Sequence, residues 1–148
     1  MTFIKNQKSG FFAYVLVAIL TVVCLGVYVA NVNMPYYEDM NMNVVYTLVG
    51  TLAAVAVSIV LPAVSGNAVV KVIADVTRVA AAALIILAGV TFIGMRLESF
   101  GYIYGSNLEL GNDAAFAAGN QAIWGIILFV VTWIVSLVAA FLPVGKKA

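Results

Sequence analysis

The segment FFAYVLVAILTVVCLGVYVA, residues 11–30, decides the fold class of this chain. It contains no charge, and it lies inside a longer charge-free stretch of 29 residues between Lys8 and Glu38. The hydrocarbon core of a bilayer is crossed by roughly 20 apolar residues in a helix. The segment therefore predicts a membrane-spanning helix.

Three further charge-free stretches repeat this pattern, with 31 residues after Asp39, 17 after Arg78 and 32 after Asp113. Turn residues divide the chain at the same places, and we expect the third loop to include the GxxxG spacing of Gly101 and Gly105. The prediction is an all-α integral membrane bundle of four transmembrane helices with short loops, one domain over residues 1–148. The expected helices cover residues 11–30, 44–61, 68–96 and 115–142, none with an internal proline because Pro62 falls in a loop.

The distribution of Lys and Arg predicts how the bundle is oriented. Basic residues in short loops favour the cytoplasmic side. Only Arg96 falls on the opposite side from the other six, which are Lys5, Lys8, Lys71, Arg78, Lys146 and Lys147. We expect both termini to be cytoplasmic. The compact loops and the lack of N-x-S/T sequons in the sequence favour a prokaryotic cytoplasmic membrane.

The composition argues against most membrane chemistry. The sequence has no histidine, and its single cysteine, Cys24, has no partner for a redox pair or a disulfide. No acidic residue lies deeper in the expected spans than the helix ends, so none is placed to act as a proton carrier or a catalytic base inside the membrane. No basic run exceeds two residues, so nucleic acid is not an expected partner. We expect no catalytic residue, no metal site and no cofactor.

Small residues on the fourth expected helix predict a packing seam. Helices in lipid associate by close packing, which small side chains permit. The seam could face a helix of this chain or of a partner. It follows steps of three and four residues, interrupted only by Phe129, through Ala115, Ala118, Ala122, Gly125, Thr132, Ser136 and Ala139.

Hydroxyl groups on the second expected helix also share one face. Thr47, Thr51 and Ser58 lie within a narrow arc at 100° per residue. Such hydroxyls bond a neighbouring helix or their own backbone, which favours packing. The alternative is a polar path for a solute.

Charges on the third expected helix form the best candidate contact site. Lys71, Asp75 and Arg78 stand at i, i+4 and i+7, so they share one face. They suit a helical extension at the headgroups, a contact with a partner protein or a lipid-headgroup site. The 17 residues up to Arg96 span only about 26 Å, so both arginines must snorkel or lie beside polar partners.

These observations predict a non-catalytic accessory or structural subunit. Its expected partners are the lipid bilayer and either another membrane protein or a second copy of itself. The alternative function is an oligomeric small-solute channel or transporter lined by the polar face of the second helix.

Overall fold

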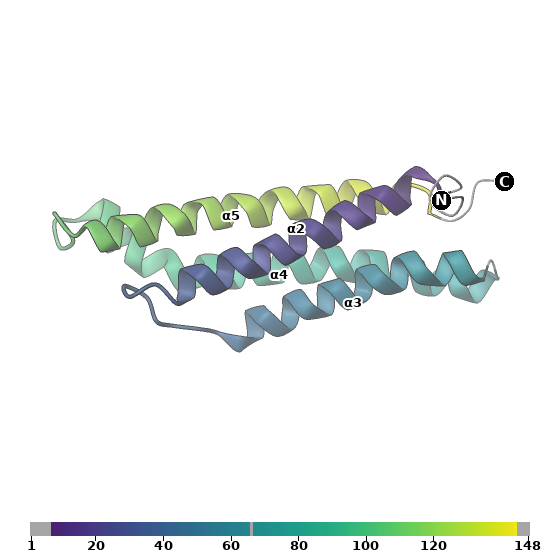
Figure 1. The fold of residues 1–148 in the computed structure, drawn as a ribbon, viewed down its shortest axis with the longest axis horizontal. Coiled ribbons are helices and arrows are strands. Elements are labelled where there is room, and N and C mark those ends of the chain that lie inside the picture. Colours follow the sequence, from purple (N-terminus) through teal and green to yellow (C-terminus); the bar gives the residue numbers. More distant parts are fainter. Residues whose placement is uncertain (1–6, 66, 145–148) are drawn as a thin grey trace.

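The computed structural model describes residues 7–65 and 67–144, and within these ranges the chain forms helices and no strand. The four helices are α2 (Ser9–Val32), α3 (Met42–Val64), α4 (Ala68–Gly105) and α5 (Asp113–Ala140) (Figure 1). Each is long and apolar enough to cross a membrane. The predicted all-α bundle of four spanning helices is confirmed.

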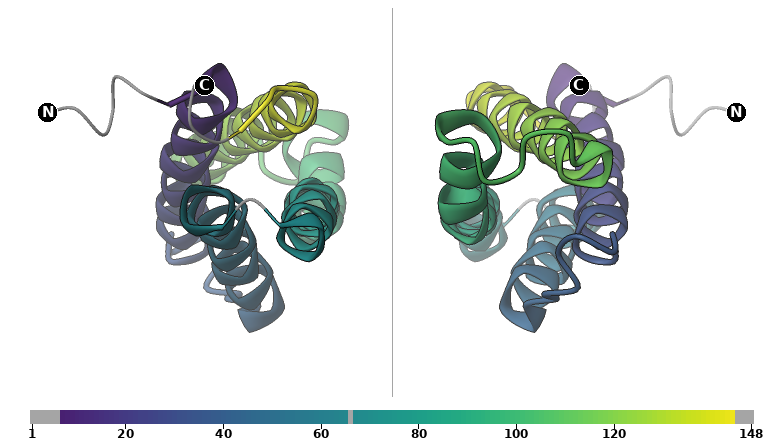
Figure 2. Two further views of the ribbon diagram at one scale, coloured as in Figure 1. Left: turned by 90° about the vertical axis from the view of Figure 1, so that its right-hand side faces the viewer. Right: turned by 90° about the vertical axis from the view of Figure 1, so that its left-hand side faces the viewer.

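The helices run up and down around one bundle axis, as the end-on views in Figure 2 show. α2 packs on α3 and α5, and α4 packs on the same two helices. The start of α2 meets the chain after α5, where the Gly10 N–H donates to the Pro143 carbonyl at 3.0 Å. Gly10 permits this approach because a Cβ there would lie 2.7 Å from that carbonyl oxygen.

The two ends of the bundle differ in charge. The basic end carries Lys8, Lys71, Asp75 and Arg78 among the described residues, and lies on the right of Figure 1. The acidic end carries Glu38, Asp39, Arg96, Glu98, Glu109 and Asp113. Lys5, Lys146 and Lys147, which also entered the orientation prediction, lie outside the described residues. Which end faces the cytoplasm stays a prediction.

Asparagines start three of the helices. The side chains of Asn41, Asn67 and Asn112 accept hydrogen bonds from the backbone N–H groups of Asn43, Val70 and Ala115. These bonds satisfy N–H groups that have no partner within the first turn of a helix. The capping asparagines therefore fix where α3, α4 and α5 begin.

α4 is longer than the sequence predicts. It continues nine residues past Arg96, so the expectation that Gly101 and Gly105 lie in a loop is wrong. Contacts with α5 hold this extension: Ile103 is buried, and the Tyr104 hydroxyl donates to Asn120 at 2.9 Å. Tertiary contacts here override the low helix propensity of glycine.

α3 also runs past its expected end. Pro62 lies inside its last turn rather than in the loop, so the expectation of spans without proline is wrong for α3. The proline removes a single backbone hydrogen bond near the helix end, which costs less than an interruption in mid-span. The other helix ends differ from the expected ones by up to two residues.

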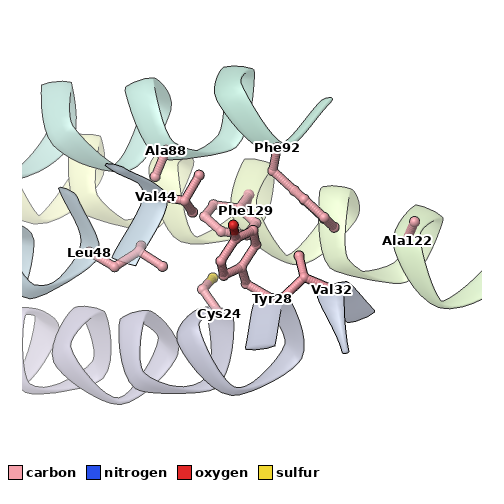
Figure 3. Packing of buried hydrophobic residues seen from close by; sticks show 9 residues of the cluster. All are labelled: Cys24, Tyr28, Val32, Val44, Leu48, Ala88, Phe92, Ala122 and Phe129. Atoms are coloured by element: carbon pink, nitrogen blue, oxygen red, sulfur yellow. The ribbon is translucent and has the colours of Figure 1, made fainter. Parts of the chain in front are cut away.

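The centre of the bundle is a cluster of apolar side chains from all four helices (Figure 3). The Phe92 ring meets the rings of Tyr28 and Phe129 at centroid distances of 5.5 and 5.8 Å. Gly125 makes room for this ring, because a Cβ at Gly125 would lie 3.0 Å from Phe92. The cluster comprises Cys24, Tyr28, Val32, Val44, Leu48, Ala88, Phe92, Ala122 and Phe129.

Candidate functional site

The small-residue seam of α5 faces the interior of this chain. All seven predicted residues are buried, as are the neighbouring Gly119 and Phe129. The Thr132 hydroxyl meets the Cys24 thiol of α2 at 3.3 Å, and the Ala118 carbonyl accepts a bond from α2. The seam thus packs against helices of the same chain.

The hydroxyl groups of α3 are engaged with protein atoms. Thr47, Thr51 and Ser58 each donate to the carbonyl four residues earlier, at 2.6, 3.0 and 2.8 Å. Ser58 also meets Thr77 of α4 at 2.9 Å, and both Thr51 and Ser58 are fully buried. These contacts fit helix packing better than the lining of a polar path.

The predicted charged face of α4 lies at the basic end. Arg78 donates from Nη1 to Asp75 at 2.7 Å, with side chains 13% and 68% exposed respectively. Lys71 is exposed. The Arg78 Nε is buried and has no hydrogen-bond partner within residues 7–65 and 67–144. Arg78 is therefore paired on one side of its guanidinium only.

A more elaborate polar site lies at the acidic end, around Arg96. This side chain is fully buried and donates to both carboxylate oxygens of Asp39, at 2.8 Å each. Its Nε donates to Asn31 Oδ1 at 3.0 Å. The Tyr37 ring covers the guanidinium with its centroid 3.6 Å from Cζ, a cation–π contact. The bidentate geometry is the strongest arrangement for an arginine–carboxylate pair.

Asn31 extends this network to α5. Its side-chain amide donates to the Ala118 carbonyl at 3.1 Å and to Gln121 Oε1 at 3.2 Å. We call Asn31, Tyr37, Asp39 and Arg96 the arginine clamp. The clamp connects α2, α4, α5 and the loop between α2 and α3.

Two tyrosines attach the loops of the acidic end to the bundle. The Tyr28 hydroxyl donates to the Asn41 carbonyl at 2.9 Å and accepts from the Asn41 N–H at 2.8 Å. The Tyr36 hydroxyl donates to Glu109 at 3.1 Å, which joins the two loops. Burial and this carboxylate raise the pKa of Tyr36. Side-chain hydrogen bonds thus hold both loops of the acidic end.

A hollow of about 230 Å³ lies over the clamp. Arg96 uses Nε, Nη1 and Nη2 within the protein, so the clamp is a structural element rather than an anion site. The described residues contain no cluster of His, Cys, Asp and Glu suited to a metal ion. The hollow is lined by Tyr36, Tyr37, Asp39, Met95, Arg96, Glu98, Ser99 and Tyr102.

The sequence indicated only part of this site. The sequence predicts that Arg96 either snorkels or lies beside polar partners. In the structure, Asn31 and Asp39 are these partners. The sequence identifies neither Asp39 as the partner of Arg96 nor Asn31 as a residue of this site. An amide just past the expected end of the first span, and an acid soon after it, were the available signals.

Compared with protein-family models, curated proteins and solved structures, the chain matches none of them.

Proposed function

We propose that this multi-pass membrane protein is a non-catalytic accessory subunit that binds a larger membrane protein through its acidic end. The observation that carries the proposal is a rigid, charged overhang at that end. α4 has 38 residues, about 57 Å at 1.5 Å per residue, against a hydrocarbon core of about 30 Å. Both ends of α4 therefore extend beyond the hydrocarbon.

The overhang consists of the end of α4, residues 106–112 and the start of α5, on the left of Figure 1. At its tip Leu108 and Leu110 are 74% and 78% exposed. We take this exposed pair of leucines as the apolar contact of the proposed binding surface. The bonds of Tyr104 to Asn120 and of Tyr36 to Glu109 hold the overhang in place, which lowers the entropic cost of docking.

The charge of this end specifies the chemistry of the partner. Asp39 is neutralised by Arg96, which leaves four acids without a described salt bridge: Glu38, Glu98, Glu109 and Asp113. Opposite charge across an interface favours association and suppresses wrong partners. We therefore propose a partner with an apolar surface that is flanked by basic residues.

The interior of the bundle supports a structural role over an enzyme or a channel. The hydroxyl groups of Thr51 and Ser58, which would line a path, bond protein atoms instead. From the six-to-one distribution of basic residues in the sequence, we place the basic end at the cytoplasmic face of a prokaryotic plasma membrane. The overhang then points outward.

Purification at native expression in a mild detergent tests this proposal. The wild-type protein should bring down one larger membrane protein in a fixed ratio. The double variant Leu108→Ser/Leu110→Ser should lose it, whereas Val64→Ser, at an 80% exposed position of the basic end, should retain it. A lone monodisperse wild-type particle, or a double variant that keeps its partner, would contradict the proposal.

A further inference from the structure

An apolar groove of about 320 Å³ runs between α4 and α5 at the basic end. It shares Val79 with a second hollow, of about 540 Å³, which extends along α4 to Asp75 and Val72. Both helices span the membrane, so the apolar groove opens toward lipid rather than water. Its lining includes Val79, Ala82 and Ala83 from α4, Trp133 and Leu137 from α5, and Phe141 directly after α5.

A charged face of α4 leads into this groove. Lys71, Asp75 and Arg78 share one side of the helix, and the next residue on that side is Ala82, which lines the groove. The three side chains sum to one positive charge, and Lys8 is at the same end. Asp75 lines the second hollow, and Lys71 and Arg78 lie beside it on the same face, so this end of the groove has a net positive charge. An apolar groove next to such a face is complementary to an anionic amphiphile.

Arg78 has binding capacity that the protein does not use. Asp75 engages Nη1, while Nε has no partner among the described residues. The Nε–Nη2 edge of a guanidinium is a fork that matches two phosphate oxygens. The Arg78 side chain is 13% exposed and its Nε is buried, so a rotation of this long side chain is required for the edge to reach a phosphate beside the groove.

We propose that this groove binds one anionic phospholipid of the adjacent leaflet. An acyl chain lies between α4 and α5, and the headgroup phosphate is bound by Lys71 and Arg78. A helix of a partner protein would fill the apolar groove equally well, but an apolar helix would not account for the positive charges of Lys71 and Arg78 beside the groove. This inference does not depend on the accessory role, which concerns the other end of the bundle.

The test is native mass spectrometry of the purified full chain, mixed with equal amounts of phosphatidylglycerol and phosphatidylcholine. The wild-type protein should retain one phosphatidylglycerol with a preference of about tenfold, since each basic residue near an anionic headgroup adds attraction. The double variant Lys71→Gln/Arg78→Gln should lose the preference. Lys8→Gln, which removes a charge from the same end but not from the groove, should keep it.

A second variant tests the groove with its charges intact. Ala83 is exposed and lines the groove, so Ala83→Phe should fill the groove without disturbing the core, and should also lose the bound lipid. A wild-type protein without preference between the two lipids would overturn the proposal. So would an unchanged preference in Ala83→Phe or in the double variant.

Discussion

The two arginines of α4 lie at opposite ends of the bundle, and the protein satisfies them in different ways. Arg96 is fully buried and bonds Asp39 from a distant loop and Asn31 from α2. Among the described residues, Arg78 bonds Asp75 alone, three residues earlier on its own helix, and that carboxylate is 68% exposed. One pair connects separate parts of the chain, and the other is local.

The two arginines differ in how completely the protein satisfies their hydrogen-bond donors. Removing a charge from water is costly unless its hydrogen bonds are replaced, and Arg96 has replacements for Nε, Nη1 and Nη2. Arg78 keeps an unused donor on a face that reaches a lipid-facing groove. We infer that the acidic end presents a rigid surface, while the basic end adjusts to what binds it.

The largest expected effect comes from breaking the clamp at its carboxylate. Asp39→Ala leaves the charge of Arg96 buried with Asn31 as its remaining side-chain acceptor. Removing one partner of a buried ion pair lowers the free energy of unfolding by about 3–5 kcal/mol. We expect about 3 kcal/mol here because the Asp39 side chain is 38% exposed. Unfolding in mixed micelles of rising SDS content, followed by circular dichroism, measures this change. Wild-type stability in Asp39→Ala would show that the clamp contributes nothing.

A smaller loss should follow from Asn31→Leu, which keeps the size of the side chain. The substitution leaves Arg96 Nε and the Ala118 carbonyl without their bonds to Asn31. We expect about 2 kcal/mol, the cost of unsatisfied buried polar groups. Asn33→Leu is the matched control, because Asn33 is exposed at the end of α2 and its side chain donates to the Val29 carbonyl of that helix. Equal losses in both variants would contradict a special role for Asn31.

The sequence predicted the architecture because length and hydropathy decide it. Four charge-free stretches suffice to place four spanning helices, and the residues of the α5 seam are those that the structure buries. The sequence failed at the ends of helices. Gly101 looked like a loop residue, but Ile103 and Tyr104 pack on α5 and extend α4 past it.

The clamp could not be predicted for a different physical reason. Arg96 and Asp39 are 57 residues apart, and their pairing depends on how the first loop folds back over α4. That loop includes Glu38 at a positive φ of 44°, a backbone state that sequence patterns seldom indicate for glutamate. The proximity of Arg78 and Asp75 could be inferred from the sequence, because helical periodicity alone brings these two residues together.

The bond between the two loops should matter less than the clamp. Tyr36→Phe removes the hydrogen bond to Glu109, at an expected cost of about 1 kcal/mol. Because the pKa of Tyr36 is raised in the folded state, its contribution is present below the ordinary value near 10. It is lost as the pH rises through the raised pKa. SDS unfolding at pH 8 and pH 11 measures how much unfolding free energy is lost between the two pH values. This loss should be smaller for Tyr36→Phe than for wild type or Tyr46→Phe.

The smallest expected effect on stability is at the local pair of the basic end. Asp75→Ala should cost about 1 kcal/mol or less, because the Asp75 carboxylate is 68% exposed and stays largely solvated in its pair with the 13% exposed Arg78. The same change removes the carboxylate that competes with a phosphate for Arg78, so retention of phosphatidylglycerol should rise. Asp39→Ala should show the opposite pattern, a large loss of stability with unchanged lipid binding. If Asp75→Ala destabilises the protein as much as Asp39→Ala does, the contrast between a clamped arginine and an adaptable one is wrong.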